Sequence, residues 1–336
     1  MGDRTGVEII STCPQSSDLA PADYARRVAE VARWSEAFGC TGILVYTDNR
    51  LADPWLVAQL VVQATQSLRP LVAVQPVYMH PYSVAKMVAS MGHLHGREVM
   101  LNLVAGGFKN DLDALGDGTP HDERYGRLVE YAYLILRLFQ GAPVTYEGTY
   151  YRVAGLRLSP RAEGVAGPRM FVSGSSEAGL GAAVALGATA VMYPKPPAMD
   201  PGAPKEVARA AVRVGIVARA TDEEAWEVAH ARFPPNRRGE IEHELARKTS
   251  DSVWHHALSA LAVRPGASAG AYWLHPFHSY RTFCPYLVGS HATVGAALEQ
   301  YLALGYRTFL LDIPASEEEL SHTSVAFEKA LGERRC

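Results

Sequence analysis

The sequence predicts an α/β fold, a (β/α)8 TIM barrel, and three observations support this prediction. Short β-branched or apolar runs alternate with longer amphipathic stretches, and about eight such units follow one another along the 336 residues. Eight strand–helix units in one chain are typical of a parallel barrel, whereas an open doubly wound sheet usually stops near about six strands. Barrels of this length commonly form one domain, so we expect residues 1–336 to fold as a single unit.

The first half of the chain supplies four of these units. Strands are expected at 7–11, 42–46, 71–77 and 99–104, with helices at 21–38, from 54, at 81–93 and at 123–138. Gly39 lies where the first helix should end, and Pro54 lies where the second should begin. Glycine is frequent just past a helix C-terminus and proline in a first turn, so both residues fit these boundaries.

The second half is interrupted twice, after the fourth and after the seventh strand. The first insertion, about 141–168, contains a hairpin expected around Glu147 and Gly148. The second, about 232–289, reads as irregular because it mixes Pro-Pro, Arg-Arg, glycine-rich and aromatic pieces. Strands are expected at 170–173, 190–193, 212–218 and 308–312, with late helices at 293–304 and 316–331. Long irregular segments in compact domains are usually functional, so we expect a mobile lid from about 232 to 285.

Composition and charge exclude several classes of protein. A net charge of -3 gives no electrostatic reason to expect nucleic acid or an acidic membrane surface as a partner. No apolar run approaches the length of a membrane span, and no signal peptide is evident, so we expect a cytoplasmic protein. The four cysteines are scattered without short spacings, and the late histidines lack a helical metal-binding register. We therefore expect neither a disulfide framework nor a metal site.

Polar residues follow several strands at the end where barrels carry their active sites. Ser173, Gly174, Ser175 and Ser176 open a helix directly after a strand, which suits a phosphate group or, more simply, a helix cap. His121 and Tyr125 form an i, i+4 pair at a helix start. That pair could contact one ligand, or belong to a charged surface cap.

Two further features lie on strands. Asn102 is followed by Gly106 and Gly107, which could let a flat ligand approach the backbone or could form a simple turn. Arg213 lies inside the apolar run AVRVGIVA, where an unpaired arginine is costly, so it should face a ligand anion or a structural carboxylate. Strand alternation places Arg213 on the face of small residues, so we expect it to point into the barrel.

Taken in order, these strings resemble the bacterial luciferase-like flavin monooxygenases. The similar segments are GILVYTDNRLADPWLVAQLV, VMLNLVAGG, GDG-TPHDERY, YEGTYYRVAGLRL and FVSGSSEAGL, and they are closest to the alkanesulfonate monooxygenase branch. The resemblance runs from about residue 40 to 230 and again over 285–313. It implies a barrel that binds reduced FMN from a separate flavin reductase and activates oxygen as a flavin peroxide. It also implies a small-molecule substrate and assembly into a homodimer or homotetramer.

The resemblance also implies roles for individual residues. Thr47 and Asn102 would lie along the isoalloxazine ring, His121 and Tyr125 near the flavin, and residues 173–176 on its phosphate. Arg213 matches an active-site arginine, and Arg281 falls within one position of a second arginine, on a lid that closes over the flavin. A lid fits this chemistry, because the oxygenated flavin decomposes unless water is excluded.

Three departures from the sulfonate branch change the expected substrate. Leu51 replaces a cysteine, Gly215 replaces a histidine and Ile313 replaces a tyrosine. Since these are polar groups of the desulfonation site, we expect another small, anionic substrate, plausibly in a specialised biosynthetic pathway. A deazaflavin (F420)-dependent oxidoreductase and a non-catalytic flavin-binding relative are the alternatives. The second is distinguished by whether Arg213 and Arg281 both reach the flavin cavity.

Overall fold

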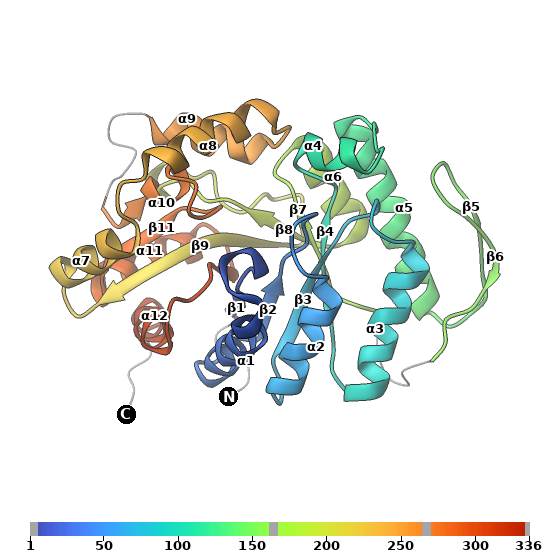
Figure 1. The fold of residues 1–336 in the computed structure, drawn as a ribbon, viewed down its shortest axis with the longest axis horizontal. Coiled ribbons are helices and arrows are strands. Elements are labelled where there is room, and N and C mark those ends of the chain that lie inside the picture. The colour runs from blue at the N-terminus through green and yellow to red at the C-terminus, as the bar shows by residue number, and fades with distance from the viewer. Residues whose placement is uncertain (1–5, 161–166, 264–269, 333–336) are drawn as a thin grey trace.

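The computed structural model describes residues 6–160, 167–263 and 270–332, and it contains a closed parallel barrel (Figure 1). Eight of the ten strands in the main sheet form the barrel. They are β1 (Glu8–Thr12), β2 (Gly42–Val45), β3 (Arg69–Val74), β4 (Met100–Val104), β7 (Met170–Ser173), β8 (Thr189–Met192), β9 (Arg209–Arg219) and β12 (Thr308–Leu311). Each pairs in parallel with the next, and β12 closes the ring by pairing with β1. The predicted TIM barrel is therefore confirmed.

Helices cover the outside of this barrel. They are α1 (Pro21–Ala37), α2 (Pro54–Ala64), α3 (Pro81–His95), α5 (His121–Phe139), α6 (Glu177–Leu186), α7 (Asp222–Arg232), α11 (His291–Ala303) and α12 (Glu317–Ala330). Shorter elements are η1 (Ser16–Asp18), α4 (Lys109–Ala114) and η2 (Pro197–Met199). Side-chain caps fix several helix starts: the Thr221 hydroxyl accepts from the Glu224 backbone N–H at 3.2 Å, as its capping-box sequence predicts.

The hydrophobic core has two layers, one inside the barrel and one between strands and helices. The interior layer is small and includes Ala211 with Phe171 and other strand residues. Val212, Val214 and Ile216 instead pack in the outer layer that includes residues of α11 and α12. Alternation along β9 therefore places Ala211 inside and the branched residues outside, as the sequence predicts.

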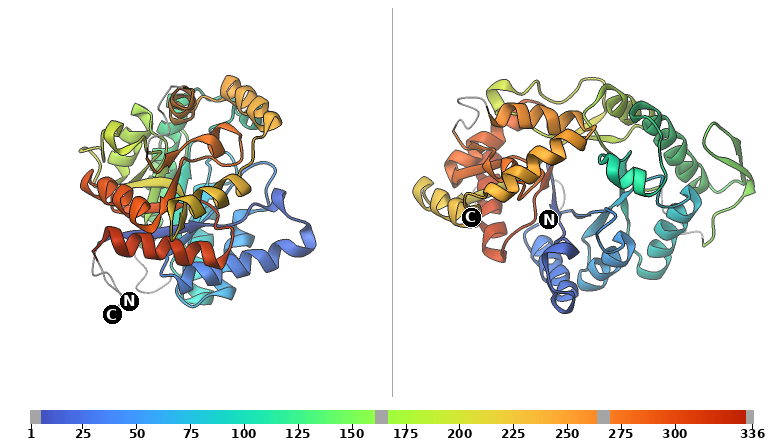
Figure 2. Two further views of the ribbon diagram at one scale, coloured as in Figure 1. Left: turned by 90° about the vertical axis from the view of Figure 1, so that its left-hand side faces the viewer. Right: turned by 45° about the horizontal axis from the view of Figure 1, so that its top comes forward.

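The first insertion forms the expected hairpin. Strands β5 (Val144–Glu147) and β6 (Arg152–Leu156) pair antiparallel and stand clear of the barrel (Figures 1 and 2). The Glu130 carboxylate of α5 accepts from the Thr149 backbone N–H at 2.8 Å, which fixes the turn against the helix. Within this insertion, residues 161–166 lie outside the described part of the chain.

The second insertion is largely ordered, so the expectation of an irregular region there was wrong. It contains α8 (Arg237–Thr249), α9 (Val253–Ala262), β10 (Tyr272–Trp273), α10 (His275–His278) and β11 (Tyr286–Ser290), with 264–269 outside the described residues. The sequence does not reveal α8 because this helix buries Gly239 and His243 rather than a stripe of apolar residues. A helix without a hydrophobic face gives no 3.6-residue period. Helices α8 and α9 lie across one end of the barrel (Figure 2).

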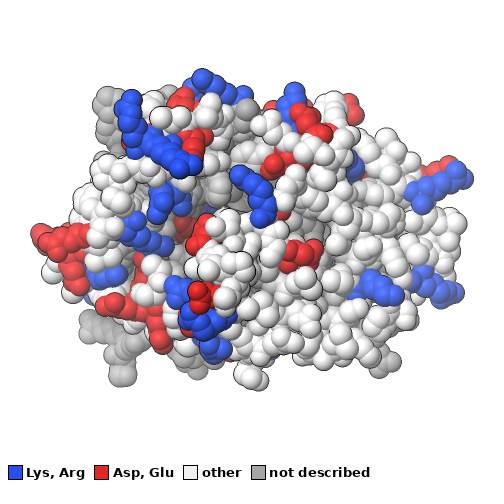
Figure 3. Space-filling view, in the orientation of Figure 1, with Lys and Arg blue, Asp and Glu red and all other residues white. Residues whose placement is uncertain are grey.

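The surface is chemically mixed. Acidic and basic side chains are interspersed over the face shown in Figure 3, which agrees with the small net charge of the chain. Among the residues described, no helix is both long and apolar enough to cross a membrane.

Candidate active site

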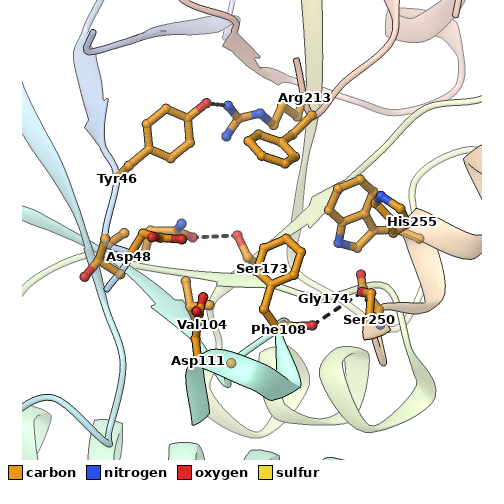
Figure 4. Close-up of a pocket in the computed structure, with 18 of the residues that line it drawn as sticks. Tyr46, Asp48, Val104, Phe108, Asp111, Ser173, Gly174, Arg213, Ser250 and His255 are labelled. Atoms are coloured by element: carbon orange, nitrogen blue, oxygen red, sulfur yellow. Dashed lines mark hydrogen bonds between the residues drawn. The ribbon is translucent and has the colours of Figure 1, made fainter. Parts of the chain in front are cut away.

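A cavity of about 840 Å³ opens at the carboxyl ends of the barrel strands. Strand ends and their following loops form its base, and the second insertion forms its cover. Every candidate residue from the sequence borders it: Thr47, Asn102, His121, Tyr125, Ser173, Gly174, Ser175, Ser176, Arg213 and Arg281. In Figure 4, Tyr46 and Arg213 point toward one another, and Ser173 and Ser250 reach the same space from other elements.

The serine run forms one polar pole of the cavity. Ser176 is the N-cap of α6 and accepts from the Gly179 backbone N–H at 3.1 Å. Ser173 donates its hydroxyl to the Asn102 side-chain oxygen at 2.9 Å (Figure 4). The first turn of α6 leaves backbone N–H groups without intrahelical partners, and the helix dipole favours a negative charge there. This pole is therefore chemically suited to a phosphate.

Tyr125 lies directly against this pole. A Cβ added at Gly174 would overlap the Tyr125 hydroxyl, so only glycine fits between β7 and α6. Burial raises the pKa of Tyr125, while a hydrogen bond with Ser176 opposes that shift, so the phenol is neutral near pH 7. The expectation that Ser175, Ser176 and Tyr125 share one barrel end is confirmed.

His121 and Tyr125 lie on one face of α5, as their spacing predicts. Their ring centroids are 5.3 Å apart in an edge-on arrangement, and both rings border the cavity. His121 also contacts the Asp122 carboxylate through Nδ1 at 2.7 Å. The pair is thus both part of a charged helix start and available to a ligand.

Part of the cavity lining is made of small residues and exposed backbone. Asn102 is buried, and because its side-chain oxygen accepts from Ser173, its amide nitrogen remains to donate. Gly106 has φ of 103°, and a Cβ there would come within 2.9 Å of Leu112. Glycine is therefore required at this turn, and the backbone beside it borders the cavity together with Thr47 and Gly107.

Arg213 forms the second polar pole. Its side chain is 5% exposed and points into the barrel, as expected. One terminal nitrogen contacts the Tyr46 hydroxyl and lies 3.8 Å from the Asp312 carboxylate, while the guanidinium stacks on the Tyr46 ring at 4.9 Å. The Nε–H group is buried and has no hydrogen-bond partner among the described residues. A buried donor without a partner costs about 1–3 kcal/mol. The Arg213 side chain borders the cavity, so its positive charge is suited to an anionic or carbonyl oxygen there.

Asp312 connects this arginine to the second insertion. Its Oδ2 accepts from the Thr282 hydroxyl at 2.6 Å and from the Tyr286 hydroxyl at 2.8 Å. Burial and the Asp312 charge raise the pKa of Tyr286 well above its ordinary value, which keeps the phenol protonated as a donor. The sequence predicts a strand at 308–312, which ends at Asp312, but it does not predict that Tyr46, Thr282 and Tyr286 lie beside this carboxylate and Arg213. Only the fold brings these side chains together, since Tyr46 and Arg213 are 167 positions apart.

The cover contacts the rest of the barrel at two places. Between α8 and α9, Ser250 pairs with Phe108 in a β-bridge, and Asp251 forms an ion pair with Arg124 at 2.8 Å. After α10, Arg281 is exposed and borders the cavity next to Thr282, which is held by Asp312. The insertion therefore has the placement expected of a lid; its mobility stays a prediction.

The cover also has an aromatic lining. Trp254 of α9 stacks on Tyr193 with ring centroids 3.7 Å apart and an interplanar angle of 6°. Behind it lies a buried pair of histidines, His243 and His255, with ring centroids 5.0 Å apart. Across residues 6–160, 167–263 and 270–332, no group of three or more His, Cys, Asp or Glu side chains is arranged to hold a metal ion.

The three residues that set this chain apart in the sequence lie at or beside this cavity. Leu51 and Ile313 border it, as apolar groups. A Cβ at Gly215 would overlap the ring of Tyr286, so the space beside this glycine is filled from the neighbouring strand β11.

Comparisons with known proteins agree with this geometry. Residues 7–308 match the family model described as luciferase-like monooxygenase. The 4-(gamma-L-glutamylamino)butanoyl-[BtrI acyl-carrier protein] monooxygenase BtrO of Niallia circulans is 32% identical over 310 residues, 90% of each chain. The EDTA monooxygenase EmoA from Chelativorans sp. BNC1 has a similar structure, with a TM-score of 0.72, 14% identity and coverage of 99% of this chain and 95% of that one. The coenzyme F420 dependent tetrahydromethanopterin reductase from Methanopyrus kandleri also has a similar structure, with a TM-score of 0.63, 14% identity and coverage of 96% of this chain and 97% of that one.

Proposed function

The chain belongs to the luciferase-like monooxygenase family, and from this premise we propose that it uses reduced FMN and O2 to oxygenate a small acyl substrate with an anionic or polar head. A separate flavin reductase supplies the reduced FMN. One oxygen atom enters the substrate, the other leaves as water, and the flavin is released oxidised. The observation that carries the proposal is one cavity that joins the serine run at the N-terminus of α6 to an arginine that is almost fully buried.

The residues present fit FMN at the serine pole. The N-cap of α6, the Ser175 and Ser176 hydroxyls and the Tyr125 phenol would hold the phosphate. Gly174 supports this assignment because no side chain can stand between the Tyr125 hydroxyl and the backbone of the run. Thr47, Asn102 and the backbone at Gly106 and Gly107, with His121 near the ring, would line the flat isoalloxazine. The bound flavin supplies the oxygen activation, which no side chain of the cavity can provide.

The chain's own residues supply binding, orientation and the exclusion of water. Arg213 borders the cavity and offers a fixed positive charge to the anionic or carbonyl oxygen of the substrate. Arg281, at the end of the cover, adds a second charge at the same cavity. The stacked Trp254 and Tyr193 close one wall, which keeps water from the reacting atoms.

The proposed substrate class comes from the Niallia circulans relative, which is 32% identical to this chain. By its name, the Niallia circulans enzyme acts on an acyl group carried by an acyl-carrier protein. We propose a carrier-bound acyl thioester for this chain as well, in a specialised biosynthetic pathway. The apolar Leu51 and Ile313 fit an acyl chain better than they fit a sulfonate.

An F420-dependent hydride transfer is the second candidate, because an F420-dependent reductase has a similar fold. That likeness, at 14% identity, concerns the fold alone. A non-catalytic flavin-binding role is less consistent with the cavity, because Arg213 and Arg281 both border it. For either oxidoreductase we expect an assembly of two or four copies in the cytoplasm.

Cofactor choice is tested by adding reduced FMN or reduced F420 anaerobically and following fluorescence at increasing cofactor concentration. We expect reduced FMN to bind at micromolar concentrations and reduced F420 to bind much more weakly. After mixing with air-saturated buffer, bound FMN should be reoxidised at a rate that depends on O2. Tight binding of F420 with no binding of FMN would refute the proposal.

A further inference from the structure

The ring of Tyr286, on strand β11, fills the space beside Gly215 of strand β9. Strand β11 runs parallel to the extended end of β9, with Tyr286 directly opposite Gly215 in register. The Tyr286 side chain is fully buried, and its ring lies where a Cβ at Gly215 would be. The pair of residues thus places one hydroxyl at a defined point beside the arginine pole.

That hydroxyl is directed at Asp312 and not at the arginine. Tyr286 and Thr282 both donate to Oδ2 of Asp312, at 2.8 and 2.6 Å. Two short hydrogen bonds occupy the two lone-pair directions of this oxygen and fix the carboxylate plane. Oδ1 is then left facing Arg213 at 3.8 Å, beyond hydrogen-bond range.

The length of this ion pair has a chemical consequence. A carboxylate that is free to turn commonly closes a short, bidentate pair with an arginine, and that pair would occupy two of the arginine donors. Here Asp312 is restrained at a distance and accepts no hydrogen bond from Arg213, whose side chain borders the cavity. The negative charge still neutralises the buried guanidinium in part, but the carboxylate occupies none of the arginine's donors.

We propose that Tyr286, supported by Thr282, is a positioning residue that holds Asp312 away from Arg213 and so keeps the arginine available to the substrate. The inference rests on the proposed role of Arg213 in substrate binding. It also gives Gly215 a role, because a side chain at this position would displace the Tyr286 ring that reaches the carboxylate.

The test is Tyr286→Phe, which removes one hydroxyl and retains the ring. Tyr306→Phe is the matched control, because Tyr306 is equally buried and donates to Asp200 at 3.0 Å, away from the cavity lining. With 4-(γ-L-glutamylamino)butanoyl pantetheine as probe, we expect Tyr286→Phe to raise KM about tenfold or more, with a smaller change in kcat. Tyr306→Phe should leave both constants unchanged while its melting temperature falls by a similar amount.

Two further measurements separate positioning from general damage. Adding Asp312→Asn to Tyr286→Phe should recover most of the lost affinity, because an amide does not capture the guanidinium. In the 1H–15N spectrum of the FMN-loaded protein, the Arg213 Nε–H signal should move in Tyr286→Phe and stay in place in Tyr306→Phe. Thr282→Val provides a second variant with the same expected spectrum change if Tyr286→Phe does not fold.

The outcomes distinguish this inference from the proposed function. If the native protein oxygenates no acyl thioester, the proposed function fails, and the spectrum still decides whether Tyr286 positions Arg213. An unmoved Arg213 signal, or equal kinetics in Tyr286→Phe and Tyr306→Phe, would overturn the positioning role. A loss of kcat with unchanged KM that Asp312→Asn does not rescue would also overturn it.

Discussion

Replacing Arg213 with alanine tests whether this arginine binds a ligand or stabilises the fold. Arg213 borders the cavity, so a substrate oxygen that contacts its guanidinium gains a charge-assisted hydrogen bond. Such a bond contributes about 1.5–3 kcal/mol, and a barrier increase of about 2.7 kcal/mol corresponds to a 100-fold loss of kcat/KM. We therefore expect Arg213→Ala to lower kcat/KM about 100-fold.

The expected loss of stability is smaller, for a reason visible in the contacts. Asp312 keeps its hydrogen bonds from Thr282 and Tyr286 when the arginine is removed, and the ion pair that is lost is long, at 3.8 Å. The truncation also enlarges an existing cavity rather than opening one in the core. We expect a cost of about 1–2 kcal/mol, which lowers Tm by only a few degrees in a domain of this size.

The assay compares kcat/KM, measured with reductase-supplied FMN, with Tm from thermal unfolding. Arg169→Ala is the control, because Arg169 pairs with Glu8 at 2.7 Å just before β7, at the opposite end of the barrel. That variant should melt earlier and keep its activity. If Arg213→Ala retains near-native turnover but melts far below the native protein, Arg213 is a structural ion-pair residue and the reasoning is wrong.

Three further predictions follow from the cavity and its cover. Gly174→Ala places a methyl group against the Tyr125 hydroxyl and should weaken FMN binding about tenfold or more, as measured by flavin fluorescence titration. The control is Gly181→Ala in α6, which has open space at its Cβ and should not change the titration. Burial lowers the pKa of His243 and His255 to about 4, so stability is fully present above pH 6.5 and should be lost as pH falls toward 4; a constant Tm from pH 7 to 5 would contradict this. Simple alkanesulfonates should give little or no sulfite, because Leu51 and Ile313 present apolar groups to the cavity and offer a sulfonate no hydrogen bonds. Robust release, at roughly 1 s⁻¹ or more, would contradict this.

The sequence predicts those parts of the fold that depend on local periodicity. Strand β9 is an example, because small residues alternate with branched ones and the alternation alone places Arg213 inside the barrel. Helix α8 is the opposite case. Its buried face is made by Gly239 and His243, so a hydrophobic pattern could not reveal it.

The candidate site likewise contains residues that the sequence predicts and residues that it does not. Residues in or at the end of the strands, such as Asn102 and Ser173, can be predicted from their order along the chain, because all parallel strands end at one face. The surroundings of Arg213 cannot be predicted in this way. Tyr46 contacts the arginine from the end of β2, a strand that does not pair with β9, and Tyr286 reaches Asp312 from the second insertion. Both positions depend on packing rather than on spacing.

The central claim is that this chain transfers oxygen from O2 to an organic substrate with reduced FMN. The most direct test supplies the protein with a flavin reductase, NADH, FMN and 4-(γ-L-glutamylamino)butanoyl thioester under oxygen-18 gas, and analyses the product by mass spectrometry. We predict a product heavier by one oxygen-18 atom, formed only with the protein present and reduced to background in Arg213→Ala. Substrate consumed without oxygen-18 in the product, or turnover supported by reduced F420 in the absence of O2, would contradict the claim.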